Sequence, residues 1–268
     1  MRAMQIALAL LGFLVLSAPA AAAPANVRLL AGGLEPQATL LAGVQIRLPP
    51  GAKTYWRSPG DSGIAPRFDW TGSQNVAAVE VLWPAPMRFE DGDGWSIGYK
   101  DGVVLPLRVT PVAPGAPVML RLRADYGVCE KLCVPARADA TLRLTAVGAD
   151  RSLIERALAR VPKPLPSPAP DGAQGVREIR IEDRDATARL VVEAAFPHGT
   201  AGADLFVEAT GGWAGPRPEA TVEDGGRLRF TMPASDLGNP ADAVLILTTV
   251  SDAGASEQRW RLARAAAK

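Results

Sequence analysis

Two cysteines, Cys129 and Cys133, are the residues of this 268-residue sequence whose type and spacing most clearly offer chemistry. They are the only cysteines in the chain, and three residues separate them. Two thiols can form a structural disulfide, exchange electrons as a dithiol and disulfide, or bind a soft metal ion. The spacing of the pair bears on the choice among these three interpretations.

The short loop between the cysteines argues against a purely structural disulfide. Closing a loop of about five residues contributes only ~2 kcal/mol to stability, compared with ~4.7 kcal/mol for a loop of about a hundred residues. Positions i and i+4 on a strand lie ~13 Å apart, whereas a disulfide needs Cα atoms about 4.4–6.8 Å apart, so the segment must fold back as a turn. A disulfide held in a tight, exposed turn is typically reducible. We therefore expect Cys129 and Cys133 to be a redox-active pair.

A metal site is the second interpretation of the same pair. Zinc needs three or four protein ligands, and the only histidine, His198, lies in a distant Phe-Pro-His-Gly segment, so zinc is disfavoured. Cu(I) is soft and accepts two thiolates, so a Cu(I)-binding module remains an alternative, as does a non-catalytic interaction module with a structural disulfide. No cofactor or metal is predicted for the exchange reaction itself.

The elements around the cysteines follow a β-sheet rhythm. The 26 glycines and 24 prolines punctuate short segments in which apolar and polar residues alternate, as is typical of a sandwich or barrel. Leu120 and Leu122, for example, alternate with two arginines. We expect the strand before the cysteines to end near Ala124 and the strand after them to begin near Ala140.

One helix and a proline-rich segment interrupt this rhythm. Residues 150–161 have apolar residues at helical spacing, and Ser152 and Glu155 are placed as a capping box. The alternating prolines of residues 162–175 predict an extended, semi-rigid linker. We therefore expect one β-domain with a closing helix over residues 24–161. A second, smaller β-domain over residues 176–264 is expected to serve docking or structure, with Trp213 in its core or, as the alternative, exposed as a contact.

The N-terminus predicts export. An apolar run over residues 6–16 precedes small residues, as in a signal peptide, which we place at residues 1–23. Removing it takes away Arg2 and leaves 28 basic residues (29 − 1) against 28 acidic ones. A chain with this charge balance lacks the excess of basic residues that is typical of nucleic-acid-binding proteins, so we expect no nucleic-acid partner. No later segment is apolar enough to span a bilayer, so we expect no membrane insertion after signal removal.

Three motifs resemble one known family. The run Asp125 to Pro135, which contains both cysteines, resembles the active-site hairpin of the periplasmic N-terminal domain of DsbD, and more closely that of its ScsB relatives. Residues 54–63 and 89–99 fall in the order that this family shows, and the similarity covers about residues 40–146. The chain departs from DsbD in its closer cysteine spacing and in lacking the transmembrane and thioredoxin-like portions.

The resemblance implies an immunoglobulin-like β-sandwich in the periplasm. It implies that Cys129 and Cys133 take electrons from a membrane donor of the DsbD/ScsB type and pass them to periplasmic thioredoxin-like or disulfide-bearing proteins. One cysteine would form a mixed disulfide and the other would resolve it. Residues 89–99 would form a loop that caps the cysteines. The aromatic residues expected in the cap or beside the pair, with core packing as the alternative for each, are Phe89, Trp95, Tyr99, Tyr126 and Tyr55.

Overall fold

The computed structural model describes residues 26–91, 94–130, 132–184, 187–209, 215–234 and 244–262. The expected signal peptide and Trp213 lie outside the described residues. Within these ranges, none of the helices combines the length and the apolar composition that crossing a membrane requires.

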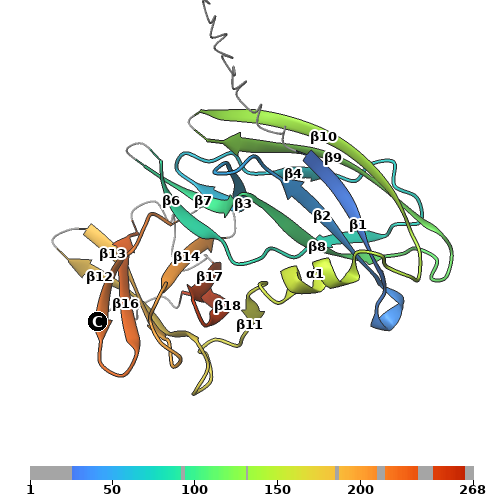
Figure 1. Cartoon of the computed structure of the whole chain (residues 1–268). Coiled ribbons are helices and arrows are strands. Elements are labelled where there is room, and N and C mark those ends of the chain that lie inside the picture. Colours follow the sequence, from blue (N-terminus) through green and yellow to red (C-terminus); the bar gives the residue numbers. More distant parts are fainter. Residues whose placement is uncertain are drawn as a thin grey trace, which may run out of the picture.

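The first two sheets of the structure pack face to face as one sandwich, which we call the N-terminal sandwich (Figure 1). The four-stranded sheet has the order β1 (Asn26–Leu34), β2 (Leu40–Arg47), β8 (Gly102–Thr110) and β5 (Ala78–Val81). The larger sheet has the order β10 (Cys133–Leu144), β9 (Val118–Cys129), β3 (Lys53–Gly60), β7 (Gly94–Lys100) and β6 (Met87–Asp91), with β4 (Arg67–Asp69) paired to β9. The all-β, immunoglobulin-like architecture is thereby confirmed.

Period-2 alternation builds the core between these two sheets. In β9 the apolar residues Val118, Leu120 and Leu122 are buried, while Arg121 and Arg123 are exposed. Successive side chains of a strand point to opposite faces, so a pattern of this kind buries one face and hydrates the other. A short 3₁₀ turn (Pro36–Ala38) joins β1 to β2.

The strands around the cysteines are longer than the sequence indicated. β9 continues past Ala124 to Cys129, and β10 begins at Cys133 rather than near Ala140. The two strands pair in antiparallel register along their whole length, with Cys129 opposite Cys133. Pairing with the neighbouring strand stabilises residues whose own sequence, with Gly127 and a proline, has low β-propensity.

The expected helix is present as α1 (Arg151–Leu158), the one α-helix in the part of the chain that the structure describes. It buries Ile154 against Leu30 and Leu41 of the four-stranded sheet. The expected capping box is wrong, because the N-cap is Asp150 and its side chain makes no cap hydrogen bond. The Asp150 carboxylate instead accepts a hydrogen bond from the backbone N–H of Ala31, so a tertiary contact replaces the local cap.

The remaining two sheets form a second sandwich, which we call the C-terminal sandwich. One sheet has the order β11 (Lys163–Pro164), β18 (Gly254–Arg261), β17 (Val244–Ser251) and β14 (Asp204–Ala209). The other has the order β12 (Gly175–Arg184), β13 (Thr187–Ala195), β16 (Arg227–Pro233) and β15 (Glu219–Glu223). A separate apolar core lies between them, built around side chains such as Leu190, Phe230 and Leu247.

The proline-rich segment differs from a free spacer. Residues 163–164 form β11 and pair in parallel with β18, and Ala169 is buried with its N–H donating to the carbonyl of Val176. Every residue of the segment keeps its backbone carbonyl, and the residues between the prolines keep their N–H groups. The segment can therefore form hydrogen bonds with the C-terminal sandwich. It is therefore part of that sandwich over these residues.

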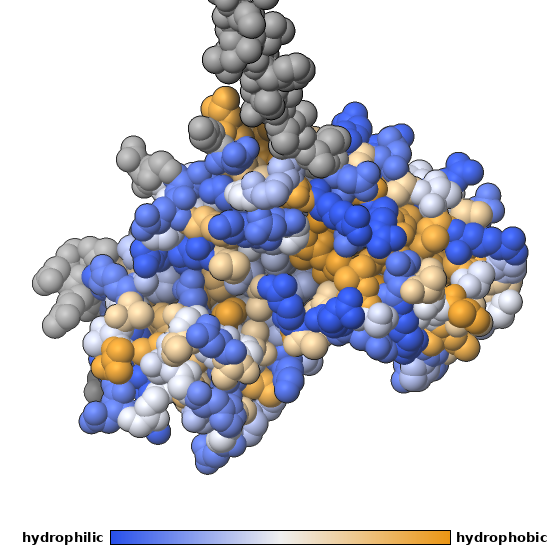
Figure 2. Space-filling view, in the orientation of Figure 1, coloured by the Kyte–Doolittle hydropathy of each residue, from blue (hydrophilic) through white to orange (hydrophobic). Residues whose placement is uncertain are grey.

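The two sandwiches contact each other through charged and aromatic residues. Phe206 of β14 is 3% exposed and belongs to the core of the N-terminal sandwich, where its ring lies 5.7 Å from that of Trp56. Arg57 bonds to Glu208 at 2.7 Å and to Glu257 at 2.5 Å. In Figure 1, β14 lies next to β6 and β3. Figure 2 shows a mainly hydrophilic surface over β10, with apolar residues gathered over β1, β2 and β8 above α1.

Candidate functional site

The two cysteines lie at the tip of the β9–β10 hairpin and are joined as a disulfide. Their Cα atoms are 4.0 Å apart, as the register of the hairpin dictates. Cys129 is 2% exposed, because it also lies opposite Lys53 of the adjacent strand β3. Cys133 begins the edge strand β10 and is exposed. Cys133 is thus exposed to solvent, whereas Cys129 is buried in the sheet.

Tyr55 of β3 contacts the disulfide directly. Its hydroxyl lies 2.9 Å from the Sγ atom of Cys133 and donates a hydrogen bond to it. The ring fits because residue 127 is glycine: a Cβ at Gly127 would lie 2.6 Å from a ring carbon of Tyr55. Burial and the charge of Asp91 raise the pKa of Tyr55, so the hydroxyl stays protonated at neutral pH and remains a donor.

Asp91 is the site residue that sequence reasoning missed. A carboxylate oxygen of Asp91 and the two sulfurs all lie within 4.8 Å of one another. The ammonium group of Lys53 lies 3.0 Å from the same carboxylate and offsets its charge. Asp91 fell inside the expected cap segment, but only the pairing of β6 with β7 places its side chain toward the cysteines.

Asp91, Cys129 and Cys133 do not together form a good copper site. The two sulfurs are bonded to each other, so a metal ion would require prior reduction of the disulfide. A carboxylate is also a hard ligand, whereas Cu(I) prefers thiolates and thioethers. The geometry around Cys129 and Cys133 therefore favours sulfur exchange over metal binding.

Phe89 lies on the same face of β6 as Asp91. The two residues are separated by one position, and residues i and i+2 of a strand share a face. The Lys53 ammonium lies 5.4 Å from the centre of the Phe89 ring, in cation–π contact. Of the aromatic residues expected in the cap, Phe89 is thus placed on the side of the sheet that carries the disulfide.

The other three expected aromatics lie elsewhere. Tyr126 and Tyr99 belong to the core of the N-terminal sandwich, where the Tyr99 hydroxyl donates to the carbonyl of Pro84 at 2.9 Å. Burial raises the pKa of both tyrosines. Trp95 lies opposite Glu90, on the face of the hairpin away from Asp91, and the Arg217 guanidinium covers its ring at 3.9 Å. The structure brings only Tyr55 and Phe89 of the five to the disulfide side.

Comparison with known proteins fits this arrangement. Residues 23–145 match the family described as "Thiol:disulfide interchange protein DsbD, N-terminal". Over these residues the chain is similar to the DsbD N-terminal family. The DsbD N-terminal match includes both cysteines, Tyr55 and Asp91, and it ends at the last residues of the hairpin. The resemblance seen in the sequence is therefore confirmed, and the C-terminal sandwich lies outside the matched segment.

A solved structure resembles the whole described fold. The N-terminal periplasmic domain of ScsB from Proteus mirabilis superposes with a TM-score of 0.65 at 20% identity, covering 90% of this chain and 92% of that chain. At this identity the similarity concerns the fold, and its coverage includes both sandwiches. No curated protein matches the sequence of the chain.

Proposed function

We propose that this chain is a periplasmic thiol–disulfide exchange protein that passes reducing equivalents through Cys129 and Cys133. The observation that carries the proposal is the asymmetry of the disulfide at the hairpin tip, where Cys133 is exposed and Cys129 is 2% exposed. An incoming thiolate can reach only a sulfur that solvent can reach. The similarity of residues 23–145 to the DsbD N-terminal family supports the same chemistry.

This asymmetry supports different roles for the two sulfurs in the proposed exchange. A donor thiolate attacks the Sγ atom of Cys133, the Cys129–Cys133 bond breaks, and Cys129 leaves as a thiolate that takes up a proton. A second donor thiol then attacks the mixed disulfide, which leaves the donor oxidised and both cysteines reduced. In the second half-reaction the Cys133 thiolate attacks an acceptor disulfide, and Cys129 resolves the new mixed disulfide. Electrons balance, because each half-reaction exchanges one disulfide for one dithiol.

The partners follow from the family and are part of the proposal. The donor is a membrane protein of the DsbD/ScsB type, and the acceptors are periplasmic thioredoxin-like or disulfide-bearing proteins. Phe89 and Tyr55 act as the shield and the hydrogen-bond donor beside the pair. The C-terminal sandwich is proposed as a docking or structural domain of its own.

A redox titration of the purified protein against glutathione or dithiothreitol tests the exchange function. We expect a potential above about −300 mV, because structural disulfides usually lie below that value. Cys129→Ser keeps the exposed Cys133, whose thiolate should attack a model disulfide substrate, release one substrate thiol and accumulate as a mixed disulfide. Cys133→Ser is the matched control and should trap much less. A potential well below about −300 mV, with neither variant trapping a partner, would show that the disulfide is a structural one.

A further inference from the structure

The β6–β7 hairpin is held from behind by the C-terminal sandwich. On β6, the Arg88 guanidinium bonds to both carboxylate oxygens of Asp204, at 3.0 and 3.2 Å, and to the carbonyl of Leu205 at 3.0 Å. It also lies 4.8 Å from the centre of the Phe206 ring, and its side chain is only 8% exposed. Arg88 therefore binds β14 of the C-terminal sandwich through charge, hydrogen bonds and stacking together.

The front of the same hairpin faces the disulfide. Arg88 is followed by Phe89, and Asp91 comes two positions later, so alternation turns these two side chains to the face opposite Arg88. One carboxylate oxygen of Asp91 lies within 4.8 Å of both sulfurs. One short strand thus carries the contact to the C-terminal sandwich on one side and the charge nearest the disulfide on the other.

The position of β6 depends on this rear contact because β6 is weakly held by its own sheet. It has five residues, lies at the end of the strand order and pairs only with β7. An isolated two-stranded hairpin is marginally stable in water. β7 in turn pairs with β3 through an irregular register that shifts between Tyr55 and Gly60. Packing from behind must therefore supply much of the constraint on where Asp91 lies.

We propose that Arg88 is a positioning residue, through which the C-terminal sandwich fixes the distance between the Asp91 carboxylate and the sulfurs of Cys129 and Cys133. The inference rests on the proposed exchange function and gives the C-terminal sandwich a part in it. A carboxylate beside a thiol disfavours the thiolate, so holding Asp91 in place keeps the pKa of the reduced cysteine high. The C-terminal sandwich thereby restrains the reactivity of the reduced pair.

Within the described residues, the titratable groups placed around the disulfide come from two elements. Strand β3 contributes Lys53 and Tyr55, and the hairpin β6–β7 contributes Asp91. Glu130 follows Cys129 in the sequence and is exposed. A change on the far side of β6 leaves the residues on β3 and in the cysteine turn in place. Any shift in thiol reactivity after such a change must then come through the β6–β7 hairpin.

The test is the pH profile of alkylation of the reduced full chain by iodoacetamide. Asp91→Asn should raise the rate at pH 7 roughly tenfold, because removing a negative charge within about 5 Å favours the thiolate. Asp204→Ala frees Arg88 and should raise the rate in the same direction by about threefold. The double variant should react no faster than Asp91→Asn alone, since the two changes act through one group.

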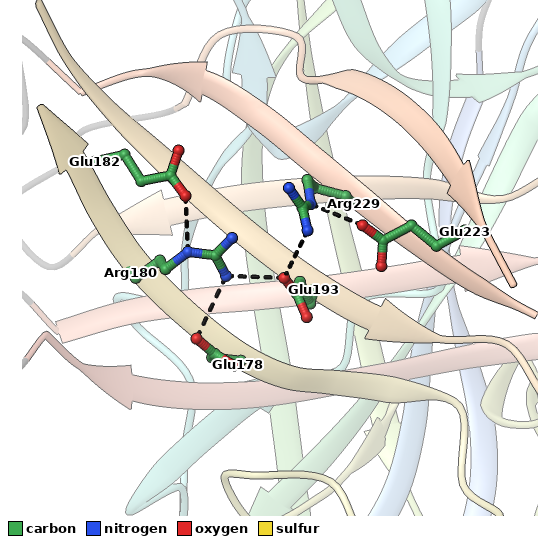
Figure 3. A network of polar contacts seen from close by, with 6 residues as sticks. All are labelled: Glu178, Arg180, Glu182, Glu193, Glu223 and Arg229. Carbon is green, nitrogen blue, oxygen red and sulfur yellow. Dashed lines mark hydrogen bonds and ion pairs between the residues drawn. The ribbon is translucent and has the colours of Figure 1, made fainter. Parts of the chain in front are cut away.

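A matched control comes from another arginine–carboxylate cluster of the C-terminal sandwich (Figure 3). There Glu193 accepts from Arg180 at 2.8 Å and from Arg229 at 3.3 Å, on the outer sheet and away from β6. Glu193→Ala should lower stability yet leave the alkylation profile unchanged. Arg217→Ala, which uncovers Trp95 on the back of the same hairpin, gives a milder second variant and should accelerate alkylation less than Asp204→Ala.

Two outcomes would overturn the positioning role. In the first, Asp91→Asn shifts the alkylation pH profile, but the profiles of Asp204→Ala and Arg217→Ala coincide with that of the unchanged protein. The other is an Asp204→Ala effect that persists in full in the Asp91→Asn background. Failure of the exchange function itself would look different, because the unchanged protein would then form no mixed disulfide with a dithiol substrate.

Discussion

At the scale of single residues, the Tyr55–Cys133 contact is the feature that most affects sulfur chemistry. The phenol donates to the Sγ atom of Cys133 at 2.9 Å, and its raised pKa keeps it a donor at neutral pH. A hydrogen bond to a charged acceptor contributes about 1.5–3 kcal/mol, which is more than one to a neutral acceptor. The contact therefore stabilises the thiolate of Cys133 more than the thiol.

We predict that Tyr55→Phe raises the pKa of the reduced Cys133 thiol by about one unit, because the thiolate loses its donor. The measurement is the midpoint of the alkylation pH profile. Tyr126→Phe is the control: Tyr126 faces the sandwich core, so removing its hydroxyl should leave the midpoint unchanged. A midpoint that moves equally in both variants would mean that general loosening of the fold, rather than the hydrogen bond, is responsible.

At the scale of elements, the β9–β10 hairpin is what brings the two cysteines together. Each strand has twelve residues, and their continuous register sets Cys129 opposite Cys133. The hairpin is held down at its far end, where Leu120 is fully buried between the sheets. We therefore expect residues at the far end of the hairpin to determine its stability and residues at the tip to determine the reactivity of the cysteines.

We predict that Leu120→Ala lowers the free energy of unfolding by about 2–5 kcal/mol, because it leaves a cavity in the core. Urea unfolding followed by circular dichroism measures the change. Arg121→Ala alters the next residue on the exposed face and should change stability by no more than about 0.5 kcal/mol. If the folded Leu120→Ala protein lost disulfide exchange, the hairpin tip and its far end would not be independent.

At the scale of the whole molecule, the C-terminal sandwich contributes to the core of the N-terminal one. Phe206 comes from β14 but packs among the buried residues of the first core, against Trp56. Burial lowers the pKa of Arg57, but the hydrogen bonds and charges of Glu208 and Glu257 outweigh it and raise that pKa overall. The Arg57 guanidinium thus stays charged at neutral pH.

We predict that Phe206→Ala destabilises the N-terminal sandwich by about 3–5 kcal/mol, because a large ring leaves a cavity in a core that belongs to the other sandwich. Hydrogen exchange should show faster exchange of the β3 amides. Phe230→Ala is the matched control, since Phe230 packs against Phe196 within the C-terminal core. Loss of protection confined to the C-terminal sandwich in the Phe206 variant would contradict this prediction.

Local patterns in the sequence were sufficient for the all-β architecture, the helix after the first β-domain and the pairing of Cys129 with Cys133. Alternation of apolar and polar residues, helical spacing and a lone cysteine pair are all readable within a few neighbouring positions. Because such patterns report only on neighbouring residues, they also explain the two predictions that were wrong. The strand ends near the cysteines and the N-cap of α1 depend on partners in other elements, such as Ala31 for Asp150.

The tertiary structure decided which of the five expected aromatic residues lie beside the sulfurs, and it added Asp91 to them. Tyr55 lies 78 positions from Cys133, and its contact depends on cross-strand register and on a glycine that leaves room. The position of Asp91 depends on which face of β6 is turned toward the disulfide. The hydrogen bond from Arg88 to Asp204 joins residues 116 positions apart in the sequence. Sequence patterns report which side chains share a face, but packing between distant strands determines which faces meet.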